Sequence, residues 1–431
     1  MQYIIKAPRQ LNQTIKLPAS KSISNRALII HALSGGHVLP KNLSDCDDTE
    51  VIIRAFQDMP RVIDVKAAGT AMRFMTAYLA TKEGEEHVLT GTERMKHRPI
   101  RVLVDALRQL GAVIDYEGEE GFPPLRITGR RLEGGTLEIP GNVSSQFISA
   151  LLLIGPVLKS GLTLHLTGDI ISRPYIDLTL SVMHQYGAVA EWGDYDTINV
   201  EPVPYGERDY FIESDWSAAS YWYEMMTLSQ NDDDRIQLEG LADGSRQGDS
   251  SLRYIFSLLG VKTAFDSKQP GQPTLVTLSR RGRPVPRLEY DFINAPDLAQ
   301  TFVVCCAVMN VPFHFRGLNT LRIKETDRIA ALIAEMRKLG YVLHDGDGTE
   351  LIWSGERCEP AVAQPVPDGQ QPVGIDTYED HRMALAFAPA AFRFDGLRIN
   401  NPHVVSKSYP HYWDDLRSAG FGIEESEHQH S

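Results

Sequence analysis

Several short polar segments of this 431-residue chain bring cations, hydroxyl groups and acids close together. In LPASKSISNR, Lys21 and Arg26 flank three serines. If a helix begins here, its first N–H groups are unpaired and its end carries a partial positive charge. Cations, hydroxyl groups and a helix start together suit the binding of a phosphate group. The GxxxxGK spacing of a Walker A loop is absent, so a nucleotide P-loop is not predicted.

Two further segments are rich in charge. GTERMKHRPI has four basic residues, ending with Arg98, in the five positions before Pro99, and a proline suits the first turn of a helix. LRIKETDR has Lys324 and Arg328 at i and i+4, with Glu325 between them. Each segment has an ordinary alternative. The first could be a solvated basic turn, and the second a surface lattice of ion pairs at a helix start.

Six times along the chain, a polar turn leads straight into an apolar, alanine-rich helical pattern. The segments are LPASKSISNRALIIHAL, AAGTAMRFMTAYLA, IPGNVSSQFISALLL, ESDWSAASYWYEMM, NAPDLAQTFVVCCAVM and DTYEDHRMALAFAPAAF. Their recurrence at intervals of about 50 to 80 residues indicates a repeated supersecondary unit. Helices that are apolar on nearly all faces are buried ones. The pattern therefore predicts six buried helices whose polar N-termini lie at interior or cleft positions, although each polar residue alone, such as Asp297, could be a plain N-cap.

Short alternating or β-branched runs, bounded by Gly, Pro or Asn, recur between these segments and predict strands. They are HVLPKNL, EHVLTG, GTLEIPG, LTLHLTG, DTINVEP, RIQLEG, PTLVTLS, VPFHFRG, ELIWSG and GLRINNP. Four further helical patterns, each followed by a glycine-containing turn, cover Pro99–Leu110, Ile176–Tyr186, Ser250–Leu259 and Thr326–Leu339. Together these signals predict an α/β fold.

The composition and the absence of certain motifs exclude several classes of function. The formal net charge of −13 argues against a broad basic surface for nucleic acid or anionic membranes. Motifs for serine or cysteine nucleophiles, zinc and dinucleotides are absent, and the four cysteines contain no CxxC pair. The chain start lacks a signal-peptide pattern, and the longest apolar stretch, Phe147–Leu158, is too short to span a bilayer. We expect a cytoplasmic, two-domain α/β enzyme that binds phosphorylated anions without a metal or other cofactor.

The polar segments also match a known family. LPASKSISNRAL, AAGTAMRF, TERMKHRPI, VSSQFISALL, SRPYIDLT, NAPDLA, RIKETDR, DHRMAL and VSKSYP occur in family order and extend from residue 17 to about residue 413. By these motifs the chain resembles the EPSP synthases, in the enolpyruvyl transferase family. The resemblance implies two lobes of three βαβαββ units each, with the buried helices' N-termini facing an interlobe cleft. The implied lobes are residues 1–20 plus 214–431, and residues 21–213.

The implied reaction transfers the enolpyruvyl group of phosphoenolpyruvate to the 5-hydroxyl of shikimate 3-phosphate through a tetrahedral intermediate. The resemblance assigns catalysis to Asp297, Glu325 and Lys21. Shikimate 3-phosphate would meet Lys21, Ser22, Arg26, Ser144, Ser145, Gln146, Ser172, Tyr175, Asp297, Thr320 and Lys324. Phosphoenolpyruvate would meet Lys21, Gly69, Arg98, Gln146, Arg328, Arg382 and Lys407. The family expectation is a monomer that binds these two small molecules and neither nucleic acid nor membrane.

Some positions depart from the family pattern. Ala19, Ala67 and Thr320 stand where Gly, Asn and Asn are common, and the Thr320 change puts one substrate contact in doubt. The stretch from Asp48 to Ala68 is shorter than usual, so one repeat is expected to lack a strand or hairpin.

Two other functions are alternatives to enolpyruvyl transfer to shikimate 3-phosphate. The related transferase that acts on UDP-N-acetylglucosamine typically uses a loop cysteine as acid, and RMKHRP contains none. A catalytically silent scaffold of the same fold would be expected to have lost Asp297, Glu325 or Arg98, all of which are present.

Phe74 stands where proline is frequent after AGTAMR. Since proline changes local helix geometry and Phe74 belongs to the helix that carries Gly69, we predict that this residue alters sensitivity to glyphosate, a competitor of phosphoenolpyruvate in the family. Inhibition constants of the parent and of Phe74→Pro should differ by more than twofold; agreement within twofold would contradict the prediction.

Overall fold

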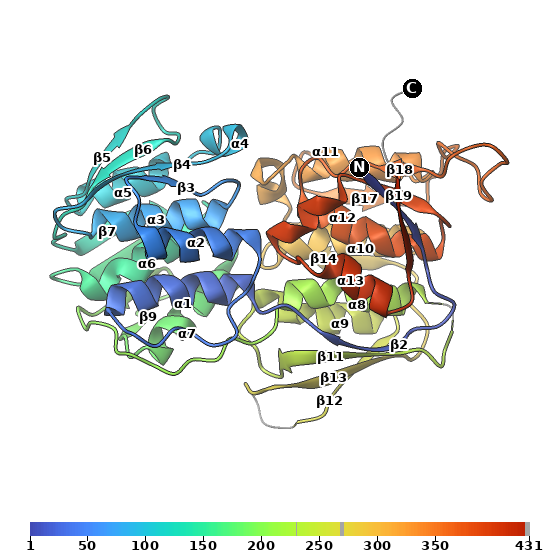
Figure 1. Ribbon diagram of the computed structural model, residues 1–431, viewed down its shortest axis with the longest axis horizontal. Coiled ribbons are helices and arrows are strands. Elements are labelled where there is room, and N and C mark those ends of the chain that lie inside the picture. Colours follow the sequence, from blue (N-terminus) through green and yellow to red (C-terminus); the bar gives the residue numbers. More distant parts are fainter. Residues whose placement is uncertain (230, 268–270, 427–431) are drawn as a thin grey trace. The chain divides into compact units, whose positions relative to one another are not determined.

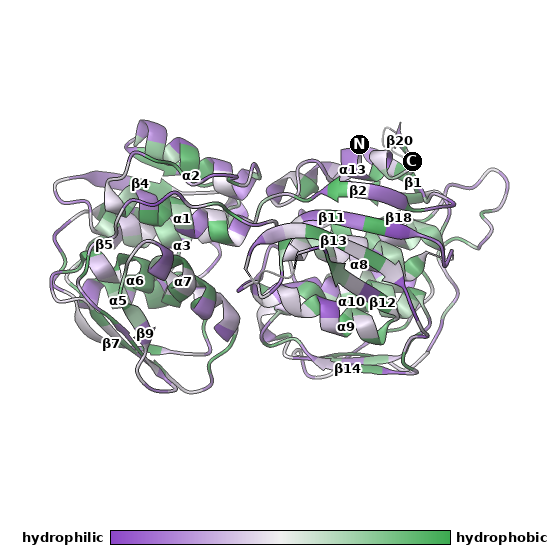
Figure 2. Ribbon diagram, turned by 90° about the horizontal axis from the view of Figure 1, so that it is seen from below, coloured by the Kyte–Doolittle hydropathy of each residue, from purple (hydrophilic) through white to green (hydrophobic). Residues whose placement is uncertain are grey.

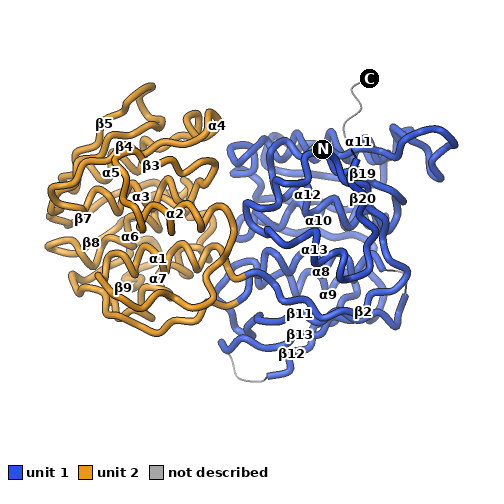
Figure 3. Tube along the Cα trace, viewed as in Figure 1, with its two compact units in different colours: residues 1–18, 214–431 blue, residues 19–213 orange. Residues whose placement is uncertain are grey.

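The computed structural model describes residues 1–229, 231–267 and 271–426. Its internal contacts divide the chain into two compact units (Figure 3). Unit 1 combines residues 1–18 with the chain from residue 214 onward, and unit 2 comprises residues 19–213. The first strand of the chain belongs to unit 1 because it pairs with two strands near the C-terminus. Each unit is described by itself.

Unit 2 contains two four-stranded sheets packed around buried helices (Figure 1). Its strands are β3 (Val62–Asp64), β4 (Glu86–Thr90), β5 (Val113–Tyr116), β6 (Leu125–Thr128), β7 (Gly135–Pro140), β8 (Leu162–Thr167), β9 (Ala190–Trp192) and β10 (Thr197–Val200). Its helices are α1 (Lys21–Ser34), α2 (Asp47–Asp58), α3 (Gly69–Ala80), α4 (Glu93–Lys96), α5 (Arg101–Gln109), α6 (Ser145–Ile154) and α7 (Arg173–Gln185). In β8 every second side chain is buried, which explains its alternating sequence LTLHLT.

Unit 1 contains three four-stranded sheets. Its strands are β1 (Gln2–Lys6), β2 (Asn12–Lys16), β11 (Arg235–Ala242), β12 (Val261–Phe265), β13 (Pro273–Arg280), β14 (Leu288–Asp291), β15 (Phe313–Arg316), β16 (His344–Asp345), β17 (Leu351–Trp353), β18 (Gly374–Ile375), β19 (Leu397–Asn400) and β20 (Gly422–Ser426). Its helices are α8 (Trp216–Leu228), α9 (Leu252–Leu258), α10 (Ala299–Val308), α11 (Arg328–Lys338), α12 (His381–Phe387) and α13 (Tyr412–Ser418).

All five sheets have one topology. In each, two strands pair in parallel and two antiparallel strands complete the sheet, as in β7-β8-β10-β9 and β14-β15-β17-β16. A buried helix directly precedes the second parallel strand, although between β2 and β11 the chain also passes through the whole of unit 2. This is the βαβαββ unit that the resemblance implies. The sixth repeat keeps its helices α1 and α2, but among the described residues its only pairing is an isolated bridge between Lys41 and Phe211. The short segment before Ala68 explains this loss, because α2 ends directly before β3.

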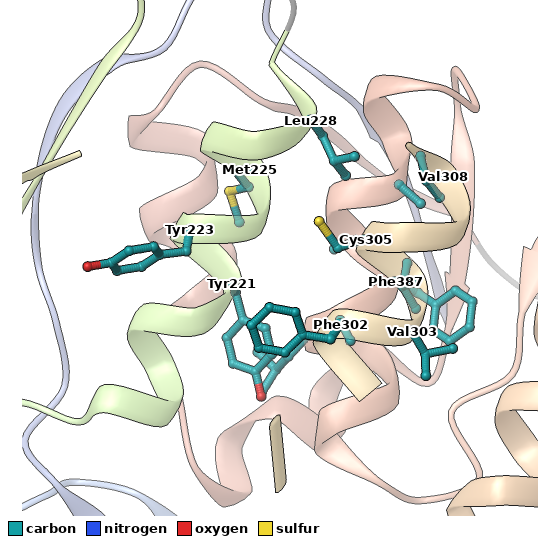
Figure 4. Packing of buried hydrophobic residues seen from close by; sticks show 14 of the residues in the cluster. Tyr221, Tyr223, Met225, Leu228, Phe302, Val303, Cys305, Val308 and Phe387 are labelled. Atoms are coloured by element: carbon teal, nitrogen blue, oxygen red, sulfur yellow. The ribbon is translucent and has the colours of Figure 1, made fainter. Parts of the chain in front are cut away.

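The six apolar segments form six buried helices, as predicted. In unit 2, apolar residues run along α1, α3 and α6 (Figure 2). In unit 1, side chains of α8 and α10 meet in the core, with Met225 and Cys305 facing the same space (Figure 4). Because these helices are buried along most of their length, the polar residues at their starts are well placed to contact a ligand.

The other predicted elements are nearly all present. Nine of the ten predicted strand runs contain a strand, and the four further helical patterns correspond to α5, α7, α9 and α11. The prediction for HVLPKNL is wrong: apart from the bridge at Lys41 the segment forms no strand, and Val38 and Leu39 are exposed. Pro40 removes a backbone donor there, and no neighbouring strand is available to pair. Across the described residues, every helix is too short or too polar to traverse a bilayer.

Phe302 tests the core of unit 1. The ring is fully buried and packs 4.4 Å from the ring of Phe256, measured between centroids (Figure 4). We predict that Phe302→Ala lowers the free energy of unfolding by about 3–5 kcal/mol, because it leaves a cavity among surrounded helices. Tyr254→Ala, at an exposed site of the same unit, should change it by less than about 1 kcal/mol in the same urea titration. Equal effects of the two substitutions would contradict the packing argument.

Candidate functional site

Many of the predicted site residues lie at or next to helix starts within each unit. In unit 2, three of them gather at the N-terminus of α3. A Cβ built on Gly69 would lie 2.7 Å from Nη1 of Arg98, so only glycine leaves room for this guanidinium against the helix start. Gln146, at the start of α6, donates from Nε2 to the hydroxyl of Thr70 at 3.0 Å. The structure thus brings Gly69, Arg98 and Gln146 together at the start of α3.

Arg98 has a free donor at this helix start. Its Nε is buried and makes no hydrogen bond within the described part of the chain. A buried donor without a partner costs free energy unless a ligand or water satisfies it. The backbone N–H groups at the start of α3 add partial positive charge at the same point, since Ala68 offers no side-chain cap. An anion bound here would accept a hydrogen bond from Nε of Arg98 and would be attracted by the N-terminus of α3.

Arg73 holds this arrangement, and the sequence reasoning did not single it out. Its guanidinium donates to the carbonyl oxygens of Gly69 (3.2 Å) and Pro99 (3.3 Å) and lies 5.8 Å from the ring centroid of Phe147. It therefore connects the residues next to Arg98 and Gln146 with the start of α3. Its position in the AGTAMR motif, four residues after Gly69, was the available signal.

Lys21 begins α1 and pairs with a carboxylate that the sequence reasoning also missed. Its Nζ lies 3.2 Å from Oδ2 of Asp48, and the two side chains are 15% and 5% exposed. Asp48 is one of the acidic residues in the first turn of α2, where negative charge is favourable. The residue before Lys21, Ser20, caps α1 by accepting from the N–H of Ile23. The ammonium group is thus held at a helix start without being fully buried.

Arg26 differs from the other predicted ligands because the protein already occupies most of its donors. It donates to the hydroxyls of Thr179 (2.7 Å) and Ser149 (3.2 Å) and to the carbonyl oxygens of Ser22 and Tyr175. Burial lowers its pKa to about 10. Arg26 therefore ties α1 to α6 and α7, and through them to the serines that begin these helices.

Four serines are predicted to meet shikimate 3-phosphate: three lie at the starts of α6 and α7, and the fourth, Ser22, is the second residue of α1. Ser144 caps α6 by accepting from the N–H of Gln146, and Ser145 is the first residue of that helix. Ser172 precedes α7 with φ 53°, a left-handed conformation that is costly for serine. Tyr175 lies in the first turn of α7, where its carbonyl oxygen accepts from Arg26.

In unit 1 the charged residues form one network centred on Arg328, the first residue of α11. This side chain is 1% exposed and contacts three carboxylates: Asp297 at 2.8 Å, Glu325 at 2.8 Å and Asp380 at 2.7 Å. Burial lowers the pKa of Arg328, but the three carboxylates raise it above its ordinary value. The surface ion-pair alternative for KETDR is therefore excluded. The expected i, i+4 helical pair is also absent, since α11 begins only at Arg328 and Lys324 precedes it in an extended conformation.

Asp297 is surrounded by cations and is not an N-cap. It lies in a short 3₁₀ turn before α10, and Arg382 (3.2 Å), Lys324 (3.5 Å) and Arg328 all contact its carboxylate. Burial raises its pKa, but the cations, Arg382 foremost, hold it well below the ordinary value. With these partners the carboxylate is ionised and is a weak base.

Glu325 lies between two cations. Its Oε1 is 2.6 Å from Nζ of Lys407, and its Oε2 is 2.8 Å from Arg328. Thr320, predicted to meet a substrate hydroxyl, lies partly exposed in the 3₁₀ turn Asn319–Ile323 just before this segment. Within unit 1, four cations thus surround Asp297 and Glu325, and Asp380 joins them from the start of α12. Such a cluster can bind an anion with more than one negative group and can move a proton.

Asp249 is a further buried acid next to this network. It is 3% exposed, and Ser217 donates to its Oδ2. Burial raises its pKa to about 6, with Arg382 acting in the opposite direction. Little in the sequence distinguishes Asp249, because QGDSS resembles an ordinary helix-capping turn.

Comparisons with known proteins agree with the resemblance. The family model for EPSP synthase (3-phosphoshikimate 1-carboxyvinyltransferase) matches residues 5–61 and 56–416. A 3-phosphoshikimate 1-carboxyvinyltransferase of Bacteroides fragilis is 57% identical over 427 residues, covering 99% of this chain and 100% of the relative. One of Photobacterium profundum is 35% identical over 436 residues, covering 94% and 96%.

Solved structures share the fold at low identity. An EPSP synthase from Acinetobacter baumannii has a TM-score of 0.77 at 20% identity and covers 98% of this chain and 100% of its own. The enolpyruvyl transferase NikO from Streptomyces tendae has a TM-score of 0.72 at 16% identity and covers 99% and 98%.

The raised pKa of Asp249 predicts a pH dependence of stability. Between its ordinary value of 3.8 and about 6, the folded chain holds a proton that the unfolded chain releases. Stability contributed by this proton is complete below about pH 4 and is lost as the pH rises to 6. The free energy of unfolding of the parent should therefore fall relative to that of Asp249→Asn over this range, by up to about 3 kcal/mol. Suppose that urea titrations at pH 4, 5, 6 and 7 give a constant difference in the free energy of unfolding between the parent and Asp249→Asn. That result would contradict the raised pKa of Asp249.

Proposed function

The chain belongs to the EPSP synthase (3-phosphoshikimate 1-carboxyvinyltransferase) family, and from this membership we propose that it transfers the enolpyruvyl group of phosphoenolpyruvate to the 5-hydroxyl of shikimate 3-phosphate. The products are 5-enolpyruvylshikimate 3-phosphate and inorganic phosphate, in the pathway to chorismate and the aromatic amino acids. The observation that carries the proposal is the network around Arg328, in which four cations alternate with the two carboxylates that the reaction needs.

The chemistry requires an acid and a base in a strongly positive site. C3 of phosphoenolpyruvate gains a proton while the 5-hydroxyl attacks C2, which gives a tetrahedral ketal phosphate. This intermediate then loses a C3 proton and phosphate. Glu325 gives and removes the C3 proton, Asp297 takes the hydroxyl proton, and Lys21 assists. Arginine forks suit the carboxylate and phosphate groups because they bind bidentately.

The ion pairs explain how Glu325 could become an acid. In the ligand-free chain Lys407 and Arg328 favour its ionised form. When the anionic groups of phosphoenolpyruvate neutralise these cations, the carboxylate loses that stabilisation of its negative charge. The same argument applies to Asp297, which then becomes a stronger base. Proton transfer is thus coupled to substrate binding.

The two substrates would use both units. We assign shikimate 3-phosphate mainly to the helix starts of unit 2, where Ser144, Ser145 and Ser172 supply donors. Phosphoenolpyruvate takes Arg98 and Gly69 from unit 2 and Arg328, Arg382 and Lys407 from unit 1. We propose that each unit corresponds to one of the two lobes. The monomeric state and the cytoplasmic location are part of the proposal, and four free cysteines are compatible with a reducing compartment.

The alternative, transfer to UDP-N-acetylglucosamine, has less support. Its typical loop cysteine is missing from residues 92–99, and the four cysteines are elsewhere, three of them buried in cores. An assay with each acceptor separates the two functions.

The direct test is phosphate release with shikimate 3-phosphate and phosphoenolpyruvate present together and with each omitted in turn. Release that needs both substrates is expected. A folded protein that releases no phosphate with both present would overturn the proposal, and release with UDP-N-acetylglucosamine in place of shikimate 3-phosphate would favour the alternative.

Role variants test the assignments. Glu325→Gln and Asp297→Ala should each lower kcat at least about 100-fold, the contribution of a general acid or base, while both substrates still bind within about tenfold. Arg98→Ala should instead weaken phosphoenolpyruvate by about 2–5 kcal/mol, the range for a lost partner of a charge pair. The matched controls are Glu289→Gln and Arg101→Ala, which alter exposed ion pairs and should leave the kinetics unchanged. Loss of binding rather than turnover in the two carboxylate variants would contradict their roles.

A further inference from the structure

The turn before α12 has an unusual backbone. The N–H of Asp380 donates to the carbonyl oxygen of Thr377 at 2.8 Å, and the two residues between them have positive φ, 52° at Tyr378 and 56° at Glu379. Positive φ at both central positions is the mark of a type I′ turn, which strongly favours glycine, asparagine and aspartate. Tyrosine and glutamate are strained there, so the surrounding structure has to hold the turn in place.

A fully buried glutamate holds the strained turn before α12 in place. Glu335, on α11, is 0% exposed, and its Oε1 accepts from the hydroxyl of Tyr378 at 2.6 Å. Its Oε2 accepts from the backbone N–H of Asp376 at 3.1 Å and lies 2.7 Å from Nζ of Lys338. The residue between these anchors, Thr377, donates its hydroxyl to the carbonyl oxygen of Asn400 at 3.0 Å. Both ends of the strained turn are therefore fixed to neighbouring elements.

The turn positions Asp380, whose carboxylate bonds to the side chain of Arg328 and to the backbone of Arg382. Asp380 directly follows it and is 0% exposed. Its carboxylate accepts from Arg328 through Nε at 2.7 Å and Nη2 at 3.3 Å, and it caps α12 by accepting from the backbone N–H of Arg382 at 2.9 Å. A shift in this turn therefore moves the guanidinium of Arg328 and the backbone that carries Arg382. In the proposed function, both bind phosphoenolpyruvate.

We propose that Tyr378 and Glu335 form a latch that holds the strained turn, and that they are positioning residues for Arg328 and Arg382 and so determine the affinity for phosphoenolpyruvate. Neither residue touches the substrate. The latch acts through Asp380, and it is distinct from the predicted helix starts that bind shikimate 3-phosphate. The inference rests on the proposed function.

Tyr378→Phe removes only the hydroxyl. We expect the KM for phosphoenolpyruvate to rise about tenfold, the effect of one lost hydrogen bond to a charged group, while the KM for shikimate 3-phosphate stays within twofold. Tyr3→Phe is the matched control, since it removes another tyrosine–glutamate hydrogen bond of unit 1, to Glu425, away from the network. It should leave both KM values unchanged.

A second substitution separates positioning from general stability. Glycine adopts positive φ without strain, so adding Glu379→Gly to Tyr378→Phe should let the turn keep its shape without the latch. The KM for phosphoenolpyruvate should then return to within about threefold of the parent. A general loss of stability would not be repaired in this selective way.

Three results would overturn the latch: an unchanged KM for phosphoenolpyruvate in Tyr378→Phe, an equal rise for both substrates, or no recovery in the double variant. A parent protein that releases no phosphate would instead overturn the proposed function. In that case calorimetric titration with phosphoenolpyruvate tests the latch directly, and the same tenfold loss of affinity in Tyr378→Phe supports it, whereas equal affinities contradict it.

Discussion

The charge of Arg328 is the constraint on which the site in unit 1 depends. A guanidinium that is 1% exposed would be very costly if it were alone, and three carboxylates from three different segments offset that cost. Removing one partner from such a network typically costs about 3–5 kcal/mol. The starts of α10, α11 and α12 are therefore fixed relative to one another by electrostatics as much as by the apolar core beneath them. Asp297 and Glu325, the carboxylates proposed for catalysis, belong to this network.

In the ligand-free chain, Asp297 and Glu325 pair with the cations that an anionic substrate would contact. Asp297 and Glu325 occupy cations that a phosphate or carboxylate ligand would need, so binding must exchange one set of anions for another. This keeps the site from carrying a large unpaired charge when it is empty, since four cations exceed three carboxylates by only one. It also means that the carboxylates become more basic at the moment when the substrate arrives. Binding and acid–base chemistry are two results of one exchange.

Sequence reasoning identified the helices well because their signals are local. Apolar, alanine-rich patterns such as AGTAMRF and APDLAQTF specify buried helices whatever surrounds them. Ion-pair partners depend on tertiary contacts, and so they were missed: nothing near Asp48 in the sequence indicates that it meets Lys21. Asp249 and Arg73 were overlooked for the same reason. The segment HVLPKNL shows the opposite error, since its apolar residues resemble a strand but no partner strand exists for it.

The net charge of −13 is a sum over the whole chain and does not indicate where cations are concentrated. Among the predicted ligands, Lys21, Arg98 and Arg328 each lie at or against the start of a buried helix, where helix charge adds to their own. The acids that outnumber the cations are largely on exposed faces, as the ion pairs of Glu86, Glu120 and Glu133 illustrate. Exposed acids reduce binding of unrelated polyanions but are screened by salt over distances of about 10 Å. They therefore weaken very little the attraction of a small substrate that carries a phosphate and a carboxylate, because a helix start shielded from solvent keeps its own attraction for anions.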